Sequence, residues 1–410
     1  MFLISPPEKE FIRHHLTDDV RQLVLRPHPA SIDIKQVAAQ IAARQKAREK
    51  LPTWYASDDV VFPPALSVEQ ASSEQTAHYK ASLVGGKQLL DLTGGMGIDT
   101  WGFAQRVDQV IYVEHRPELA ELAAYNLSQL GATNVMVQVG DGLAIVDQLS
   151  QPADWIYLDP HRRDEQGGKV VRLADCEPDV SRVDVLASLL HQADKVLLKT
   201  SPLVDLDGTI RQFAAGSKIS GQNAVESIHV VAVQGEVKEV LFVLTKHETA
   251  IDTIEINAIN LLTDSTIRFA FKREEERQTH VALGNPQHYI YEPNAAVLKA
   301  GAFRLAATRF GLVKLAPNSH LYTSSDYKGD FPGRIFQLDH VIKPNQTELH
   351  QLVPSGKANL TVRNFPQSVA ELRKKLKLSE GGDTYIFATT LMNGDKRLLI
   401  TKKINQVASL

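Results

Sequence analysis

Residues 89–99 read Leu89-Leu90-Asp91-Leu92-Thr93-Gly94-Gly95-Met96-Gly97-Ile98-Asp99, an apolar run followed by a glycine-rich segment. This pattern predicts a buried strand, a tight turn and the first turn of a helix. Gly95 and Gly97 can adopt positive φ angles and let a ligand approach the backbone without meeting a Cβ atom. The helix would add unpaired backbone N–H groups. We therefore expect the turn to bind a nucleoside cofactor, although a strand-to-helix turn without a ligand also favours glycine.

The spacing of the glycines indicates the class of cofactor. A dinucleotide site needs Gly-x-Gly-x-x-Gly, and Thr100 occupies the third glycine position, so the sequence does not support a bound pyrophosphate. Asp91, Gly95 and Gly97 follow the pattern Asp-x-x-x-Gly-x-Gly, which resembles the first motif of class I S-adenosylmethionine methyltransferases. The resemblance implies S-adenosyl-L-methionine as the cofactor, bound by these three residues and Thr93.

Acidic residues follow three further apolar runs. Glu114, Asp141 and Asp159 each come at or just after the end of a predicted strand. Ligands of open α/β sheets bind at the carboxyl ends of the strands, so we expect these residues and Asp91 at one edge of the sheet. Glu114 is the candidate acceptor for the ribose hydroxyls, and Asp141 for the adenine amino group. The alternative for each acid is a turn or capping role.

The composition suits a soluble protein of several domains. The chain has 410 residues, 43% hydrophobic and 23% charged, enough for about two to four domains. Its one cysteine, Cys176, cannot form a disulfide within the chain, which fits a reducing cytoplasm. The N-terminal apolar run is too short for a signal peptide, and no run reaches membrane-spanning length. We expect a cytoplasmic, monomeric protein with no membrane partner and no metal.

The charge is distributed unevenly. A net charge of −3 argues against a globally basic nucleic-acid binder. From Lys343 onward, however, eleven Lys and Arg residues stand against five Asp and Glu residues, and residues 373–377 carry four of the cations. This region is either a phosphate-contacting face or a solvated helix face.

The N-terminal region has a helical pattern over residues 1–72. Asp33 is a candidate N-cap for a helix that ends before Pro52. Trp54 and Tyr55 are predicted in the loop beyond it. They either stack on a base or pack in the core.

Beyond residue 249 the pattern predicts a small α+β arrangement. Residues 254–259 alternate like a half-exposed strand, and residues 294–310 are predicted as one helix with an alanine-rich face. Asn393-Gly394-Asp395 predicts a hairpin turn. Further strands are predicted near residues 334–340, 359–363, 385–390 and 398–402, and helices at residues 345–352 and 367–376.

Four motifs besides the glycine turn carry a resemblance over most of the chain. They are Gln75-Thr76-Ala77-His78-Tyr79-Lys80, Leu158-Asp159-Pro160-His161-Arg162-Arg163, Tyr291-Glu292-Pro293-Asn294 and Val362-Arg363-Asn364-Phe365-Pro366. With the core, these motifs resemble bacterial methyltransferases that have a ferredoxin-like segment and a THUMP-like C-terminal domain.

This resemblance implies an α/β fold, a Rossmann-like seven-stranded methyltransferase sheet with an N-terminal helical segment and C-terminal α+β domains. It implies a helical domain at residues 1–72, the methyltransferase domain at 73–248, the ferredoxin-like segment at 249–328 and the THUMP-like domain at 329–410. True THUMP domains deliver structured RNA to a catalytic domain. The resemblance therefore implies an RNA substrate, either tRNA or rRNA.

Asp159 and Pro160 indicate one candidate chemistry. Many enzymes that methylate an exocyclic amine carry Asp or Asn, two prolines and an aromatic at this strand end, where an oxygen and a backbone carbonyl accept the amine hydrogens. Here His161 follows Pro160, so base methylation requires His161 to replace the aromatic. Arg162 and Arg163 either bind a phosphate or solvate the loop.

A second arrangement implies methylation of the ribose. Lys80, Asp159, Lys199 and Glu239 resemble the Lys-Asp-Lys-Glu set of ribose 2′-O-methyltransferases, in which a lysine of lowered pKa helps to deprotonate the hydroxyl. The alternative is a group of surface salt bridges. We favour base methylation slightly and take Asp159, Pro160 and Lys199 as the candidate catalytic residues, with Lys80 binding substrate.

Other classes of function stay open at this level. Methylation of cytosine C5 needs a nucleophilic cysteine, and Cys176 lies among acids that disfavour a thiolate. A non-catalytic nucleoside- or RNA-binding scaffold and a dehydrogenase are the remaining alternatives. Titration with S-adenosylmethionine and with NAD separates them.

Overall fold

The computed structural model of the protein describes residues 4–162, 172–214 and 222–404. The contacts within the chain divide it into two compact units. The first unit runs from the N-terminus to Ile228 and includes Glu239–Ile251, and the second comprises His229–Lys238 and the chain from Asp252 onward. None of the helices in the described ranges is long and apolar enough to cross a membrane.

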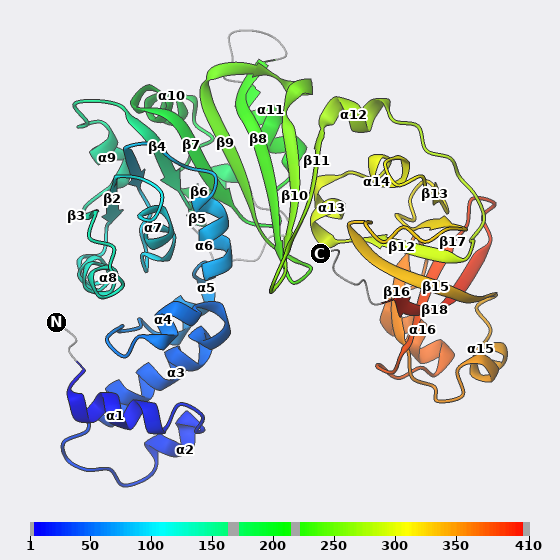
Figure 1. The fold of residues 1–410 in the computed structure, drawn as a ribbon, viewed down its shortest axis with the longest axis horizontal. Coiled ribbons are helices and arrows are strands. Elements are labelled where there is room, and N and C mark those ends of the chain that lie inside the picture. The colour runs from blue at the N-terminus through cyan, green and yellow to red at the C-terminus, as the bar shows by residue number, and fades with distance from the viewer. Residues whose placement is uncertain (1–3, 163–171, 215–221, 405–410) are drawn as a thin grey trace. The chain divides into compact units, whose positions relative to one another are not determined.

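The first unit begins with a group of helices, drawn in blue in Figure 1. The Asp33 side chain accepts hydrogen bonds from the backbone N–H groups of Lys35 and Gln36 at 3.0 and 3.2 Å, which confirms Asp33 as an N-cap. The helices are α1 (Pro6–His14), α2 (Val20–Val24), α3 (Ile34–Lys50), α4 (Pro52–Ala56), α5 (Ala65–Gln70) and α6 (Glu74–Ala81).

The prediction that Trp54 and Tyr55 lie in a loop is wrong. Both residues belong to α4, which begins with Pro52 directly after α3 ends. Proline suits the first position of a helix because its φ is already helical and its missing N–H would have no partner there. Trp54 is completely buried, so it packs in the core instead of stacking on a base.

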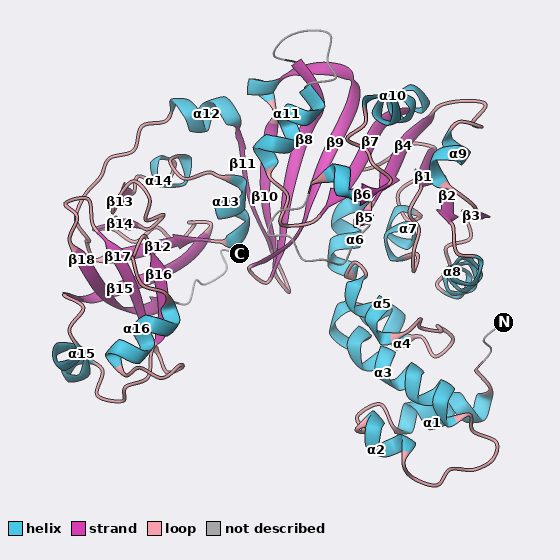
Figure 2. Ribbon diagram, turned by 180° about the vertical axis from the view of Figure 1, so that it is seen from behind, coloured by secondary structure: helices cyan, strands magenta, loops and turns pink. Residues whose placement is uncertain are grey.

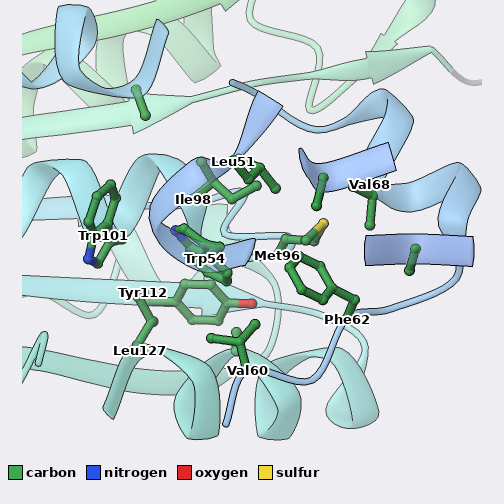
Figure 3. Packing of buried hydrophobic residues seen from close by; sticks show 14 of the residues in the cluster. Leu51, Trp54, Val60, Phe62, Val68, Met96, Ile98, Trp101, Tyr112 and Leu127 are labelled. Carbon is green, nitrogen blue, oxygen red and sulfur yellow. The ribbon is translucent and has the colours of Figure 1, made fainter. Parts of the chain in front are cut away.

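One hydrophobic cluster joins the helical group to the sheet domain (Figure 3). Figure 3 shows Leu51, Trp54 and Phe62 from the helical group beside Trp101 and Tyr112 from the sheet domain. The rings of Trp54 and Trp101 meet edge to face, with centroids 6.4 Å apart, a favourable aromatic geometry. The helical group therefore shares part of its core with the sheet domain.

Among the described residues the larger sheet has nine strands: β11 (Thr266–Lys272) and β10 (Glu255–Leu261), followed in order by β8-β9-β7-β4-β1-β2-β3, and Figure 2 shows its strands in magenta. The neighbours from β7 to β3 are parallel, whereas β9 runs antiparallel to β7. The seven strands from β8 to β3 confirm the predicted Rossmann-like methyltransferase fold, and β10 and β11 extend this sheet beyond the seven strands predicted. The strands are β1 (Gln88–Asp91), β2 (Gln109–Glu114), β3 (Val135–Val139), β4 (Ala153–Leu158), β7 (Ala193–Thr200), β8 (Gln222–Val233) and β9 (Glu236–Ala250).

Helices connect the parallel strands, as parallel neighbours require. Strands β1 to β4 therefore end at the same edge of the sheet, and the residues that follow them meet there. The connecting elements are α7 (Ile98–Phe103), α8 (Pro117–Gln129), α9 (Gly142–Val146), the short strands β5 (His161–Arg162) and β6 (Cys176–Glu177), α10 (Val183–Gln192) and α11 (Leu206–Ala214), with 3₁₀ turns at Leu173–Asp175 and Ile251–Thr253.

The second unit contains another sheet, with the strand order β13-β14-β12-β15-β18-β17-β16. Strands β10 and β11 pair antiparallel and belong to the larger sheet, where β10 lies beside β8. The elements are β10 (Glu255–Leu261), β11 (Thr266–Lys272), α12 (Arg273–Gln278), β12 (Tyr289–Pro293), α13 (Ala295–Ala300), α14 (Leu305–Thr308), β13 (Val313–Lys314), β14 (Tyr322–Ser324), β15 (Gly333–Ile342), α15 (Gln346–Leu352), β16 (Asn359–Arg363), α16 (Val369–Leu376), β17 (Thr384–Thr390) and β18 (Lys396–Ile404).

Two predictions for this unit are wrong in detail. Strand β10 is buried on both faces, because Asn257 and Asn260 are themselves buried and their side-chain oxygens accept hydrogen bonds from Arg268 and from the Gly235 backbone N–H at 2.9 Å. The helix predicted over residues 294–310 is two helices. Gly301 takes a φ of +82° and ends α13, which is the usual role of glycine at a helix C-terminus.

Candidate cofactor and active site

The Asp91 side chain stabilises the glycine turn between β1 and α7 through two hydrogen bonds. One carboxylate oxygen accepts a hydrogen bond from the Thr93 backbone N–H at 3.1 Å, and the other from the Thr100 hydroxyl at 2.6 Å. Gly95 and Gly97 have φ angles of +55° and +84°, which glycine adopts without strain. Asp91 is therefore a positioning residue for the turn.

Asp91 lies in a strongly desolvated environment. Its side chain is buried, and burial raises the pKa of the Asp91 carboxyl to about 7. The hydrogen bonds from Thr100 and Thr93 offset part of this rise. A positive charge beside Asp91 would favour its carboxylate form.

A cavity of about 630 Å³ opens above the turn, at the carboxyl ends of the strands. It gathers six of the residues predicted from the sequence, namely Thr93, Gly95, Glu114, Asp141, Asp159 and His161. Among the described residues, Lys80, Asp91, Gly97, Pro160 and Lys199 do not line it.

Glu114 at the end of β2 is positioned by the backbone around it. One carboxylate oxygen accepts from the backbone N–H of Arg116 at 3.0 Å, and the other from the backbone N–H of Gly95 at 3.1 Å. A carboxylate oxygen has two lone pairs, so the oxygen that faces Gly95 can accept another hydrogen bond. Glu114 can therefore bind a hydroxyl of a ligand in the cavity.

Asp141 and Asp159 lie on the same cavity. Asp141 caps α9 by accepting from the Ala144 backbone N–H at 3.0 Å. The backbone N–H of Asp159 donates to the Thr93 hydroxyl at 2.7 Å, which ties the end of β4 to the glycine turn. Asp141 thus combines the capping role with a place in the cavity wall.

A buried group of charges lies beside the cavity. The Lys80 ammonium is completely buried and contacts Glu239 at 2.8 Å and Asp99 at 3.1 Å. Lys199 forms an ion pair with Asp159. The structure therefore pairs the four residues of the predicted Lys-Asp-Lys-Glu set two by two, and Lys80 is not the surface cation of the alternative interpretation.

The pKa of Lys199 contradicts the expectation that a lysine of the Lys-Asp-Lys-Glu set has a lowered pKa. Burial alone would lower the pKa of Lys199, but attraction to Asp159 and Glu239 outweighs burial and raises the pKa above its ordinary value. A lysine that serves as a base must give up its proton at neutral pH. The expected lysine of lowered pKa is therefore not Lys199.

The motif after Pro160 lies partly outside the described residues. His161 is exposed and lines the cavity. Arg162 belongs to β5, and its side chain, like all of Arg163, lies outside what the structure describes, so their phosphate-binding role stays a prediction.

Sequence reasoning missed two members of the charged group. Asp99 accepts a hydrogen bond from the Tyr157 hydroxyl at 2.7 Å besides its contact with Lys80. Asp99 resembled an ordinary first-turn acid of α7, and Tyr157 an ordinary strand residue. The signal that could have revealed Asp99 is its place four residues after Gly95, as the one charged residue in the segment Ile98–Phe103.

The cavity suits a nucleoside with an amino-acid tail. A Cβ atom added to Gly95 would meet only the Thr93 carbonyl oxygen, at 3.8 Å, so the turn leaves open space on its ligand side. Glu114 and Asp141 offer acceptors for hydroxyl and amino groups. In the described part of the chain, no three His, Cys, Asp or Glu side chains are grouped to hold a metal ion.

Comparison with known proteins identifies the family. A crystal structure from Porphyromonas gingivalis W83, assigned as a methyltransferase, is 36% identical to this chain and superposes with a TM-score of 0.83, covering 97% of this chain and 98% of its own. This chain belongs to the same methyltransferase family. Models of a ferredoxin-like domain and of a THUMP domain-like region match residues 289–332 and 333–403 of this methyltransferase.

The sheet domain has more distant methyltransferase relatives. Residues 63–160 match the model of protein-L-isoaspartate(D-aspartate) O-methyltransferase. Protein-L-isoaspartate O-methyltransferase 1 of Archaeoglobus fulgidus is 41% identical over 76 residues, which are 18% of this chain and 35% of that protein. The chain thus spans about a third of this curated relative. The methyltransferase uses S-adenosyl-L-methionine, as the motif predicted.

Proposed function

We propose that this methyltransferase modifies RNA and that the acceptor is a nitrogen of a base, placed at Asp159. The observation that carries the proposal is the position of Asp159, which lines the cavity and is tied to the cofactor turn by its hydrogen bond to Thr93. Thr93, Gly95, Glu114 and Asp141 would bind the cofactor, which supplies the methyl group when bound. Asp91 and Gly97 would shape the turn beneath it.

The carboxylate of Asp159 suits an amine acceptor. Its side chain is 38% exposed, so it can reach a ligand while Lys199 holds one of its oxygens. A carboxylate accepts hydrogen bonds only, and the hydrogens of an amine are donors. Accepting them turns the nitrogen lone pair toward the methyl group, and the Pro160 carbonyl can accept a second hydrogen. His161 offers the ring that would lie against the base.

Ribose methylation is the less favoured candidate. It requires Lys80 or Lys199 to take a proton from a hydroxyl. Lys80 is enclosed by Glu239 and Asp99, and Lys199 is paired with Asp159. Asp159 and Glu239 stabilise the protonated form of Lys199, and Lys80 does not line the cavity, so neither lysine is placed to act as the base.

The RNA substrate rests on the THUMP-like region at residues 333–403. The isoaspartate methyltransferase match ends at Pro160, so it covers the cofactor half of the domain. The protein acceptor of that enzyme is therefore not transferred to this chain. Whether the RNA is tRNA or rRNA is decided by experiment.

The test combines cells and purified variants. Digests of tRNA and rRNA from cells with and without the protein should differ in one base-methylated nucleoside, detected by mass spectrometry. Asp159→Ala should reduce turnover on that RNA by at least about a hundredfold, with S-adenosylhomocysteine affinity nearly unchanged. Asp159→Asn should retain part of the activity, since an amide oxygen also accepts from an amine.

Lys199→Ala separates the two acceptors. A mild loss of turnover with a base-methylated product supports the amine acceptor. A loss as large as that of Asp159→Ala, together with a 2′-O-methyl nucleoside, would establish ribose methylation instead. Asp108→Ala, which changes an exposed carboxylate of the same unit, is the control. Full activity of Asp159→Ala would reject both acceptors.

A further inference from the structure

The second unit contains a polar cavity of about 650 Å³ that the proposed methyl transfer does not use. Glu292, Asn294, Arg334, Arg363 and Lys403 all line it. Two of the motifs that carry the family resemblance, at residues 291–294 and 362–366, contribute to its wall.

Glu292 organises the cationic side of this cavity. Its carboxylate is only 3% exposed and accepts from the guanidinium of Arg334 at 2.8 Å and from that of Arg363 at 3.0 and 3.2 Å. The ring of Phe336 lies under Arg334, 5.5 Å from the guanidinium carbon. Both guanidinium groups are therefore held in fixed orientations.

The backbone is built to bring these groups together. Three strands separate β12, which carries Glu292, from β16, which carries Arg363, so the sheet must curve for the two to touch. A Cβ atom on Gly333 would lie 2.1 Å from the Glu292 carbonyl oxygen. Only glycine lets β15 approach β12 this closely and places Arg334 beside Glu292.

The cations exceed what Glu292 needs. One arginine neutralises the buried carboxylate, whereas Arg334, Arg363 and Lys403 together leave a surplus of two positive charges in the cavity wall. Each guanidinium has five N–H donors and turns its Nε–Nη2 edge to Glu292. The remaining donors of each arginine can serve a ligand.

Asn294 adds a further donor. Its side-chain oxygen caps α13 by accepting from the Val297 backbone N–H at 3.0 Å. Its amide nitrogen is buried and has no hydrogen-bond partner among the residues that the structure describes. A buried donor without a partner costs stability, so an acceptor on a bound ligand would satisfy it.

We propose that this cavity binds a phosphate group of a nucleotide. Guanidinium groups in fixed orientations match the oxygens of a phosphate, which accepts two parallel hydrogen bonds. Lys403 adds a further positive charge, and the cavity is large enough for the sugar and base of a nucleotide together with its phosphate. The phosphate belongs either to a free mononucleotide or to the backbone of an RNA. The site does not depend on which atom the methyltransferase modifies.

The experiment measures binding to the full-length protein with two probes, adenosine monophosphate and a short single-stranded RNA that lacks terminal phosphates. Lys403→Ala should weaken binding by about tenfold, the scale for a lost charged hydrogen bond. Lys402→Ala is the matched control, because Lys402 is the adjacent residue and pairs with Asp339 at 3.5 Å outside the cavity. It should leave both affinities unchanged.

A second variant tests the two arginines while keeping a positive charge at each position beside the buried Glu292. Arg334→Lys with Arg363→Lys keeps two cations beside Glu292 but loses the paired donors, so binding should again weaken at least about tenfold. Weakening with both probes indicates a mononucleotide-type site, and weakening with the RNA alone indicates a backbone phosphate. If Lys403→Ala and the double variant bind both probes as Lys402→Ala does, the proposal is wrong. S-adenosylhomocysteine affinity, measured in parallel, reports on the cofactor site separately.

Discussion

Asp91 shows how one residue of a sequence motif acts through its neighbours. The pattern Asp-x-x-x-Gly-x-Gly predicts an acid near the cofactor. In the structure, the Asp91 carboxylate is enclosed by Thr93 and Thr100 beneath the glycine turn and does not reach the cavity wall. The direct role of Asp91 in cofactor binding stays a prediction, because what the structure shows is the support of the turn.

The raised pKa of Asp91 predicts a pH-dependent stability. The carboxyl titrates near its ordinary value in the unfolded chain but at about 7 in the folded protein. Below about pH 4 both states are protonated, and the folded state has its full stability. Between about pH 4 and 7 only the unfolded chain loses the proton, so stability falls by up to about 1.4 kcal/mol per pH unit.

Asp91→Asn removes this titration and keeps the shape of the side chain. Its amide oxygen can accept from Thr93, and its amide nitrogen can donate to the Thr100 hydroxyl. The melting temperature of the variant, measured without cofactor, should therefore rise relative to the wild type as the pH increases from 5 to 8. Asp108→Asn, at an exposed position, serves as the comparison. A difference for Asp91→Asn that does not change with pH would contradict the assignment.

At the level of elements, the sequence predicted the positions of the strands better than the ends of the helices and the contacts between distant residues. Apolar runs ending in acids located the sheet edge, because buried parallel strands are continuously apolar. The break after Gly301 was not predicted, since glycine within an alanine-rich pattern only lowers helix propensity. The burial of Trp54 agrees with the core-packing alternative, but its partner Trp101 was not predicted, because the two residues lie far apart along the chain.

Substitution of Trp54 tests how far the stability of the helical group depends on its packing against the sheet domain. The side chain is completely buried in the cluster shared by both segments. Trp54→Ala should reduce the free energy of unfolding by about 3 to 5 kcal/mol, in a single transition monitored by urea titration. Trp54→Phe should cost less, because it keeps an aromatic ring and removes an indole N–H that has no partner among the described residues.

The control for this prediction is Leu66→Ala in α5, where the side chain is 64% exposed. It should change the stability by less than about 0.5 kcal/mol. A separate early transition in Trp54→Ala, with the rest of the protein unaffected, would show that the helical group folds independently of the sheet domain.

At the scale of the whole molecule, topology explains what the sequence could and could not predict. The sequence predicted that four charged residues converge, because each follows or precedes a strand of one sheet: Lys80, Asp159, Lys199 and Glu239. The order of the strands in that sheet is enough to bring them together. The Glu292 site was not expected, since it depends on the curvature of the second sheet. The predicted domain boundaries stay predictions. The chain passes from one compact unit to the other after Ile228, after Lys238 and after Ile251.

The charge of the whole chain leads to the last prediction. The net charge is −3, so the proposed RNA substrate would be attracted by local groups of cations. If about three phosphates are neutralised by Arg334, Arg363 and Lys403, RNA affinity should fall roughly tenfold or more between about 50 and 200 mM salt. Cofactor affinity should change by less than about twofold, because S-adenosylhomocysteine has no phosphate and the hydrogen bonds proposed for Glu114 and Asp141 would release no counterions. Fluorescence anisotropy of a labelled RNA and calorimetry with S-adenosylhomocysteine measure the two slopes. An RNA affinity independent of salt would exclude phosphate contacts as the basis of substrate binding.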